Sequence, residues 1–431
     1  MKKIALIVYL CALTLTSAAA QTGPAAGGAK ASAADLRQET FDVVWRTVKE
    51  KHFDPTLGGV DWDKVRERYA PRVSAVKSDG ELYDLLQQML GELHQSHFRV
   101  IPPEAIIQSE SKVPEGGGIG IDIRFIDNQA VITRLQPGSS AAGAGLRTGF
   151  VIKKVDDATV EQITGPFLKS KESPAMTRLF MIHAVLRRIN GKPDTPVRIT
   201  YLDEKDQPRE AVVTRERFKG EMSPAFGNFP PQYTEFESKR LENKIGYIRF
   251  NIFVTMLMDK IRAAIREMSD APGIIIDLRG NPGGVGGMAN GIAGMLETKQ
   301  VSLGVMKMRT TQLSFIAFPQ AGAYAGPVVV LIDGGSASTS EVFAAGIQEL
   351  GRATVVGEQS MGAALPSQII QLPTGARLQY AVADFKTPKG VLIEGRGVRP
   401  DVEVSLSRRA LLEGRDSQLE AAIEQIRKSK T

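Results

Sequence analysis

The first quarter of the chain carries apolar residues at helical spacing. Phe41, Val44 and Val48 recur three or four positions apart, and leucines repeat in the same way over residues 82–93. Residues at this spacing share one face of a helix, which is buried against a neighbour. The pattern predicts a small N-terminal helical domain over residues 33–108.

The next part of the chain changes to a strand pattern. Ile121-Asp122-Ile123 alternates between apolar and polar, and Ala130-Val131-Ile132 is a short apolar run; we read both as strands. A helical run over residues 176–190 and closing strands over residues 197–213 follow. We expect a second domain over residues 112–217.

The last part alternates between buried strands and helices. Apolar, β-branched runs at residues 245–250, 273–278 and 327–332 predict strands that are covered on both faces. Helical patterns follow these runs, and the alternation is typical of an α/β domain. We place this domain over residues 230–431, with a C-terminal helix at residues 416–428.

The first twenty residues have the pattern of a secretory signal peptide. Lys2 and Lys3 precede an apolar run that ends in alanines at residues 18–20. Residues 21–32 are rich in alanine and glycine, which predicts a disordered leader. We therefore expect a periplasmic or extracellular protein. The one cysteine, Cys11, lies within the signal, and no small residues precede it as a lipid anchor requires. The mature chain then has no thiol for catalysis, disulfides or zinc binding.

The charge pattern excludes some functional classes. A formal net charge of +6 is small for 431 residues, and acidic and basic residues are interspersed. This argues against a nucleic-acid-binding protein. After residue 20, no segment is long and apolar enough to span a bilayer. The sequence leaves open whether the chain forms an oligomer.

The stretch from Asp333 to Glu341 joins a predicted strand to a predicted helix. It contains a Gly-Gly turn and three serines, Ser336, Ser338 and Ser340, close to the free amides at the start of the helix. Developing negative charge is stabilised at such a place, as acyl transfer by a serine requires. The alternative interpretation is that these residues only cap the helix.

A second glycine-rich turn, residues 279–284, also follows a buried strand. It lacks the lysine of a phosphate-binding loop and the glycine spacing of a dinucleotide-binding loop, so we expect no nucleotide cofactor. Its amides are instead suited to binding an oxyanion.

Four histidines limit the choice of a general base. His183 lies in an apolar helical run and is interpreted as a structural residue. His52 precedes Asp54-Pro55 and is interpreted as a surface residue. His94 and His97 remain, at a boundary between helix and strand. Their spacing would also suit a metal, but without cysteine or an obvious third ligand we expect none.

The second predicted domain resembles a PDZ domain. The resemblance rests on the loop Gly118-Ile119-Gly120-Ile121, the Pro-Gly-Ser-Ser-Ala-Ala segment at residues 137–142 and the Gly-Phe-Val-Ile segment that begins at residue 149. PDZ domains bind a terminal carboxylate at such a loop and pair an extended peptide with a strand edge. The resemblance therefore implies a peptide or an unfolded protein as the partner.

Three further motifs occur in order, at residues 277–284, 335–341 and 397–401. Together with the PDZ-like region they resemble serine peptidase family S41, which contains the C-terminal processing (tail-specific) peptidases and the tricorn core peptidases. The resemblance covers nearly the whole chain after the signal. It implies a crotonase-like α/β core, no metal, and Ser338 as the nucleophile.

One departure from the family bears on the mechanism. The processing peptidases pair their serine with a lysine, and the matching position here is Ala363, which cannot accept a proton. Tricorn-like members instead use a Ser-His pair ahead of the PDZ domain and a late glutamate. The chain has Ser96-His97 and Glu394 at these places.

The resemblance thus implies a histidine-based relay. Its members are Ser338 as nucleophile, His97 as general base, Ser96 and Glu394 as orienting residues, and the amides of Thr339 and of Gly283 or Gly284 as the oxyanion hole.

Two functions follow from this pattern. The first is a secreted or periplasmic serine endopeptidase that cleaves peptides or unfolded proteins. The competing hypothesis is a protein of the same fold that has lost catalysis and binds a peptide or an apolar ligand.

Overall fold

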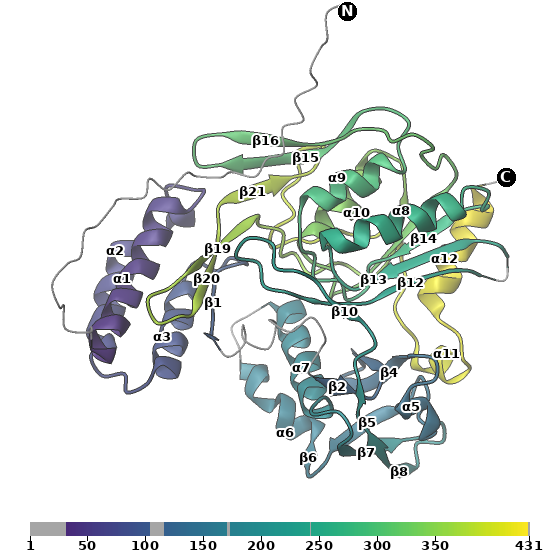
Figure 1. The fold of residues 1–431 in the computed structure, drawn as a ribbon, viewed down its shortest axis with the longest axis horizontal. Helices are drawn as coiled ribbons and strands as arrows, with labels where there is room; N and C mark the ends of the chain where they lie inside the picture. Colours follow the sequence, from purple (N-terminus) through teal and green to yellow (C-terminus); the bar gives the residue numbers. More distant parts are fainter. Residues whose placement is uncertain (1–31, 104–115, 170–172, 242, 430–431) are drawn as a thin grey trace, which may run out of the picture.

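A helical unit forms the N-terminal part of the computed structural model, which describes residues 32–103, 116–169, 173–241 and 243–429. Its helices are α1 (Ala33–Lys51), α2 (Trp62–Val73) and α3 (Asp79–Gly91), with the 3-10 turn η1 (Leu57–Gly59) after α1 (Figure 1). Phe41, Val44 and Val48 are fully buried, which confirms the predicted helix face. The predicted signal peptide and all but the last residue of the leader lie outside the described residues.

This helical unit shares its core with a late segment of the chain. After α3, strand β1 (Arg99–Ile101) pairs antiparallel with β20 (Arg377–Ala381), which pairs in turn with β19 (Ser367–Gln371). Leu365, Leu372 and Leu378 are buried in the same cluster as the helix faces. Residues on either side of position 97 therefore lie next to residues beyond position 360.

The second unit is a sheet with a long helix beside its edge strand. The order is β3 (Ile121–Ile126), β4 (Gln129–Leu135), β5 (Val151–Val155), β7 (Pro196–Leu202) and β8 (Pro208–Thr214), with β6 (Ala158–Thr159) on β5. A small ladder joins β2 (Gly117–Gly118) to β9 (Glu216–Arg217). The helices are α5 (Ser140–Gly143), α6 (Val160–Thr164) with the 3-10 segment η2 (Gly165–Lys169), and α7 (Pro174–Ile189), which packs near β3. The predicted strands and the long helix are confirmed.

The third unit contains the main sheet. Its strand order is β12 (Phe236–Arg240), β13 (Gly246–Phe250), β14 (Ile274–Asp277), β17 (Val328–Ile332), β18 (Thr354–Gly357) and β22 (Val402–Glu403). Only β12 pairs antiparallel; the other neighbours are parallel. Strands β14 and β17 are buried along their whole length, as expected for parallel strands covered on both faces. The two glycine-rich turns leave the adjacent carboxyl ends of β14 and β17, so they meet at one edge of the sheet.

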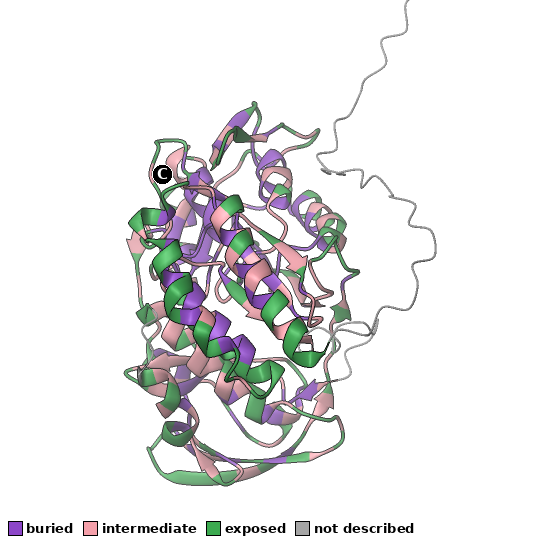
Figure 2. Cartoon of the chain, turned by 90° about the vertical axis from the view of Figure 1, so that its left-hand side faces the viewer, coloured by how far each residue is buried: buried purple, intermediate pink, exposed green. Residues whose placement is uncertain are grey.

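Helices cover both faces of this sheet. Helices α8 (Met258–Glu267), preceded by the turn η3 (Thr255–Leu257), α9 (Gly287–Gly294) and α10 (Thr339–Glu349) pack on one face, and α12 (Ser417–Lys428) packs on the other. Buried and exposed positions alternate along the helices in Figure 2. No helix in the described part of the chain combines the length and the apolar character that a bilayer crossing needs.

Smaller elements extend this unit. Strands β15 (Val301–Met308), β16 (Gln312–Ala317) and β21 (Ala383–Lys386) form a three-stranded sheet in the order β16-β15-β21. Strands β10 (Glu221–Met222) and β11 (Tyr233–Thr234) form a short ladder. Helix α11 (Arg408–Leu412) leaves the core to pack Leu411 against Val131 and Val151 of the second unit.

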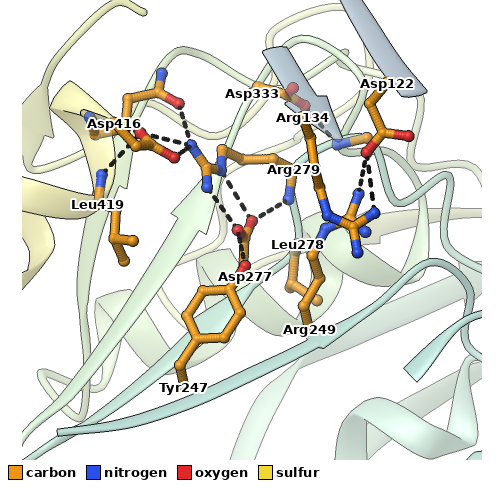
Figure 3. A network of polar contacts seen from close by, with 12 residues as sticks. Asp122, Arg134, Tyr247, Arg249, Asp277, Leu278, Arg279, Asp333, Asp416 and Leu419 are labelled. Atoms are coloured by element: carbon orange, nitrogen blue, oxygen red, sulfur yellow. Dashed lines mark hydrogen bonds and ion pairs between the residues drawn. The ribbon is translucent and has the colours of Figure 1, made fainter. Parts of the chain in front are cut away.

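A buried ion pair joins the end of β14 to the start of α12 (Figure 3). Arg279 donates to both carboxylate oxygens of Asp277, at 3.0 and 2.6 Å, and to Asp416 at 2.8 Å. The Tyr247 hydroxyl also donates to Asp277, at 2.7 Å. Burial alone would raise the pKa of the Asp277 carboxyl, but the Arg279 guanidinium outweighs it and holds that pKa well below its ordinary value. The turn after β14 is therefore fixed to the last helix.

We expect Arg279→Ala to destabilise the fold by about 3–5 kcal/mol at pH 7, because it leaves the Asp277 carboxylate buried and uncompensated. Urea unfolding measures the change in the free energy of unfolding. Lys64→Ala is the matched control: its ion pair with Asp61 is exposed, so we expect a loss of less than about 1 kcal/mol. Equal losses in the two variants would contradict the importance of the buried pair.

Candidate active site

Ser338 lies in the sharp turn between β17 and α10. Its φ of 53° and ψ of −117° are unusual for a residue with a side chain, and such a backbone costs about 1–3 kcal/mol unless its surroundings hold it. The Ser338 amide donates to the Ala363 carbonyl at 2.8 Å and to Glu341 Oε2 at 3.0 Å. These two bonds fix the backbone that carries the hydroxyl.

The other two serines of this stretch are engaged in the fold. Ser336 is fully buried and donates its hydroxyl to the Leu278 carbonyl at 2.8 Å. Ser340 is also fully buried and donates to the Asn281 carbonyl at 2.8 Å. Ser338, by contrast, is partly exposed. Of the three hydroxyls, that of Ser338 is therefore the one best placed to reach a substrate.

Ser96, His97 and Glu394 form a hydrogen-bonded series. Ser96 Oγ lies 2.7 Å from His97 Nδ1 and donates to Glu394 Oε2 at 2.9 Å, and the Ser96 amide donates to Glu394 Oε1 at 2.8 Å. Because the one hydroxyl proton of Ser96 points to the carboxylate, Ser96 accepts from Nδ1–H of His97. The second ring nitrogen, Nε2, then carries a lone pair.

The electrostatics of this series suit a proton acceptor. Burial, and then the neighbouring Arg99 guanidinium, lower the pKa of His97 to about 4, so its ring is neutral at neutral pH. Burial raises the pKa of Glu394, although the amides and hydroxyl that donate to it act in the opposite direction.

The peptide between Ala363 and Ala364 links Ser338 to this series. Ala363 accepts the Ser338 amide through its carbonyl, and Ala364 donates its amide to Glu394 Oε2 at 2.9 Å. Among the described residues, no hydrogen bond joins Ser338 Oγ to His97. The structure thus connects Ser96, His97 and Glu394 directly and connects Ser338 to them through the backbone.

Glu341 holds this arrangement together, a role that its sequence context did not predict. It is fully buried and accepts four hydrogen bonds: from Ser360 Oγ at 2.5 Å, and from the amides of Gly362, Ala363 and Ser338 at 2.7, 3.0 and 3.0 Å. Burial raises its pKa to about 7 despite these donors. The Ser-x-x-Glu spacing at a helix start is the signal that could have drawn attention to it.

The structure corrects one predicted oxyanion donor. The Gly283 amide donates to Asn281 Oδ1 at 2.9 Å and is not available to a substrate. Gly283 instead lies against Ser338, since a Cβ added there would come within 2.8 Å of Ser338 Cβ. The amides of Gly284 and Thr339 have no hydrogen-bond acceptor among the described residues. Thr339 Oγ1 donates to the Gly284 carbonyl at 2.9 Å and holds the two together.

Helix α7 of the second unit covers the turn that carries Ser338. Its side chains Ala175, Met176 and Leu179 pack on Ala337, Met361 and Ala363. On the same side, Arg124 of β3 donates to Asp333 Oδ2 at 2.7 Å, and Asp333 Oδ1 accepts the amides of Gly280 and Gly335. The second unit is therefore docked on both turns of the site.

The predicted PDZ loop lies at the entry to β3. Ile119 and Ile121 are buried, and the carbonyls of Ile119 and Gly120 accept amides from Ala141 and Gln136. Gly118 belongs to the β2 ladder. Gly120 has a φ of 77°, and a Cβ there would lie 2.5 Å from Ser139 Cβ, so only glycine fits. The amides of Ile119 and Gly120 have no acceptor within the described ranges.

Two histidine assignments are wrong. His52, assigned to the surface, is fully buried, and His183, assigned to the fold, lies at an exposed position of α7. His94 is exposed as well. In the part of the chain that the structure describes, no group of three or more histidine or acidic residues could hold a metal ion.

We expect Glu341→Gln to lower kcat by about a hundredfold, because the amide NH₂ would face backbone amides that need an acceptor. Kinetics on an unstructured protein substrate measure the loss. Glu349→Gln, at the other end of the same helix, is the control and should retain activity. Unchanged kcat in Glu341→Gln would show that the nucleophile turn holds its shape without the carboxylate.

The raised pKa of Glu341 gives a pH dependence with a defined sign. Between the ordinary value near 4.5 and the folded value of about 7, the folded protein binds the extra proton, so its contribution to stability falls as pH rises. We expect the stability of the wild type relative to Glu341→Gln to fall by about 3 kcal/mol from pH 4.5 to pH 7.5. Urea unfolding across this range measures it, and a constant difference would contradict the shift.

Comparisons with known proteins show that the chain is similar to peptidases. The family model of peptidase family S41 matches residues 244–404, and that of the tricorn protease C1 domain matches residues 34–91. The chain is 27% identical over 363 residues to the carboxyl-terminal-processing protease of Synechocystis sp., covering 83% of this chain and 78% of that protein. It is 25% identical to the putative tricorn protease homolog 2 of Streptomyces coelicolor, covering 91% of this chain but 32% of the larger protein.

Solved structures show the same fold. The photosystem II D1 C-terminal processing protease superposes with a TM-score of 0.58 at 24% identity, over 88% of this chain and 96% of that one. The tricorn protease superposes with a TM-score of 0.55 at 18% identity, over 93% of this chain and 37% of that one. Residues 244–404 are therefore a peptidase family S41 domain, and the chain is a serine-type peptidase.

Proposed function

We propose that the protein is an exported endopeptidase that cleaves peptides or unfolded proteins, with Ser338 as nucleophile and His97 as general base. The observation that supports this best is the hydrogen-bonded series from Glu394 through Ser96 to His97. It fixes the tautomer in which Nε2 can accept a proton, as the aspartate does in a Ser-His-Asp triad.

Each step of the reaction has a group to carry it. Ser338 Oγ attacks the scissile carbonyl carbon while its proton passes to His97 Nε2. The C–N bond then breaks as His97 returns that proton to the leaving amine. Water repeats the sequence on the ester and releases a carboxylic acid. The Glu394 carboxylate, acting through Ser96, stabilises the imidazolium that forms in each half.

The oxyanion of each tetrahedral intermediate needs two donors. The amides of Gly284 and Thr339 are unengaged among the described residues and flank the Ser338 turn, and Thr339 is the first residue of α10. The positive end of the helix dipole adds to their effect.

The surroundings of Ala363 support a histidine base over a lysine base. Ala363 is buried in an apolar cluster with Ala337 and Met361. Its amide and carbonyl hold Glu341 and Ser338, and its methyl group offers no site for a proton. A base must therefore reach Ser338 from another part of the chain.

We further propose that residues 33–108, 112–217 and 230–431 are an N-terminal helical domain, a PDZ domain and a crotonase-like core. The PDZ assignment draws support from the open edge of β3 beside α7 and from the amides of Ile119 and Gly120, which are unengaged within the described residues and suit a peptide terminus. Because α7 covers Ala337 and Ala363, substrate entry requires this domain to shift. Export rests on the signal-like pattern of residues 1–20.

We expect Ser338→Ala to abolish cleavage of an unstructured protein and labelling by a fluorophosphonate probe. His97→Ala should lower kcat/KM by about 10³-fold, because it removes the proton acceptor while the oxyanion donors remain. His94→Asn is the control, since His94 is exposed in the same turn and asparagine tolerates its φ of 50°.

Other outcomes would redirect the assignment. Full activity of His97→Ala would give the base role to another group, such as Lys386 or Lys389. A wild-type protein that neither reacts with the probe nor cleaves substrate, yet binds peptides, would be the ligand-binding protein of the competing hypothesis.

A further inference from the structure

His52 is buried beside the catalytic pair, although it lies 45 positions from His97 in the sequence. It ends α1, is fully buried, and belongs to no step of the proposed reaction. Its Nε2 lies 2.9 Å from Gln95 Oε1. Since that oxygen can only accept, Nε2 carries the proton. Nδ1 lies 3.0 Å from both the carbonyl oxygen and the amide nitrogen of Asp54, and with the proton on Nε2 it accepts from the amide. Both ring nitrogens are thus satisfied.

The His52 ring also stacks on two aromatic side chains. Phe98 stacks on it with the ring centroids 5.3 Å apart and the planes 9° apart, and Phe53 stacks at 4.5 Å. Gln95 and Phe98 are the residues immediately before and after Ser96-His97. The His52 imidazole therefore contacts the residues on both sides of the catalytic pair. It hydrogen-bonds to Gln95 and stacks on Phe98.

The segment from His94 to Phe98, which His52 contacts, needs stabilising contacts from other parts of the chain. His94 and His97 have φ values of 50° and 62°, a backbone region that side-chain-bearing residues adopt at a cost. His52 is itself tied to the core, because Arg309, beyond the end of β15, donates to its carbonyl at 3.0 Å. A cation at this carbonyl also complements the C-terminal end of the α1 dipole.

We infer that His52 is a positioning residue that sets the place and orientation of His97 by clamping Gln95 and Phe98. Its hydrogen bond to Gln95 prevents the strained turn from relaxing, and its stacking on Phe98 fixes where β1 begins. A displacement of about 1 Å at a catalytic group lowers a rate about a hundredfold. The inference rests on the proposed function, in which His97 is the general base.

Two variants separate the hydrogen bond from the packing. His52→Phe keeps an aromatic ring between Phe53 and Phe98 but loses the donor to Gln95. His52→Gln keeps a donor close to the Nε2 position but loses the ring. We expect kcat to fall about tenfold or more in His52→Phe and about threefold in His52→Gln, with KM unchanged in both. We expect the melting temperature to fall more in His52→Gln than in His52→Phe, because the stacked ring is the larger apolar contact.

A double-mutant cycle tests the proposed route. Gln95→Met removes the acceptor at nearly constant volume, and the double variant with His52→Phe should lose no more kcat than the more impaired single variant. Val48→Ala, on the buried face of α1, is the stability control: it should lower the melting temperature without lowering kcat below the melting range.

Three results would overturn the inference. They are a wild-type kcat in His52→Phe, a kcat that follows the melting temperature across His52→Phe, His52→Gln and Val48→Ala, and independent, multiplying losses in the double variant. If His97→Ala loses activity while His52→Phe does not, this inference fails and the proposed function stands. If His97→Ala retains full activity, the proposed function fails first.

Discussion

One buried carboxylate holds the active-site turns of this protein in place. Glu341 receives donors from the nucleophile turn at Ser338 and from the segment 360–363, and that segment continues to the amide that donates to Glu394. An acceptor with four lone-pair positions suits this task, because the Ser360 hydroxyl and the amides of Gly362 and Ala363 would otherwise be buried without an acceptor. The strained backbone of Ser338 persists because its surroundings over-determine it.

The interface between the second unit and the core is mainly polar beside the main sheet and apolar over the turn that carries Ser338. Asp122 accepts from Arg249 and Arg134 (Figure 3). Arg124 donates to Asp333, whereas α7 makes the apolar contact over Ala337. The Asp122 pair with Arg134 lies between partly exposed groups, and such a pair contributes little net free energy. A small apolar contact is also inexpensive to break. Such an interface holds a defined resting position and still allows a peptide to displace the unit.

The sequence predicted what depends on local pattern and missed what depends on long-range contact. Periodicity identified the buried strands at 273–278 and 327–332 and the helix face at Phe41. The helix after Ser338 begins three residues earlier than its apolar pattern, at Thr339, because the turn residues themselves are buried. His52 was misassigned because the residues around it in the sequence are charged apart from Phe53, whereas the Gln95 amide and the Phe98 ring that also bury it lie 43 and 46 positions away. The Gly283 amide looked available because nothing in the sequence shows that the Asn281 side chain turns back on it.

The pairing of β1 with β20 has a consequence for how the protein matures. The hydrogen bond between Ser96 and Glu394 spans 298 positions, and the strand beside His97 finds its partner only when residues near 379 are available. Contacts between residues so far apart in the sequence form late in folding, because the long loop between them must first be closed. A chain that emerges from its N-terminus therefore carries an incomplete set of catalytic groups until its last quarter has folded. Competence to cut other polypeptides then arises together with the native state, so that partly folded copies do not digest one another.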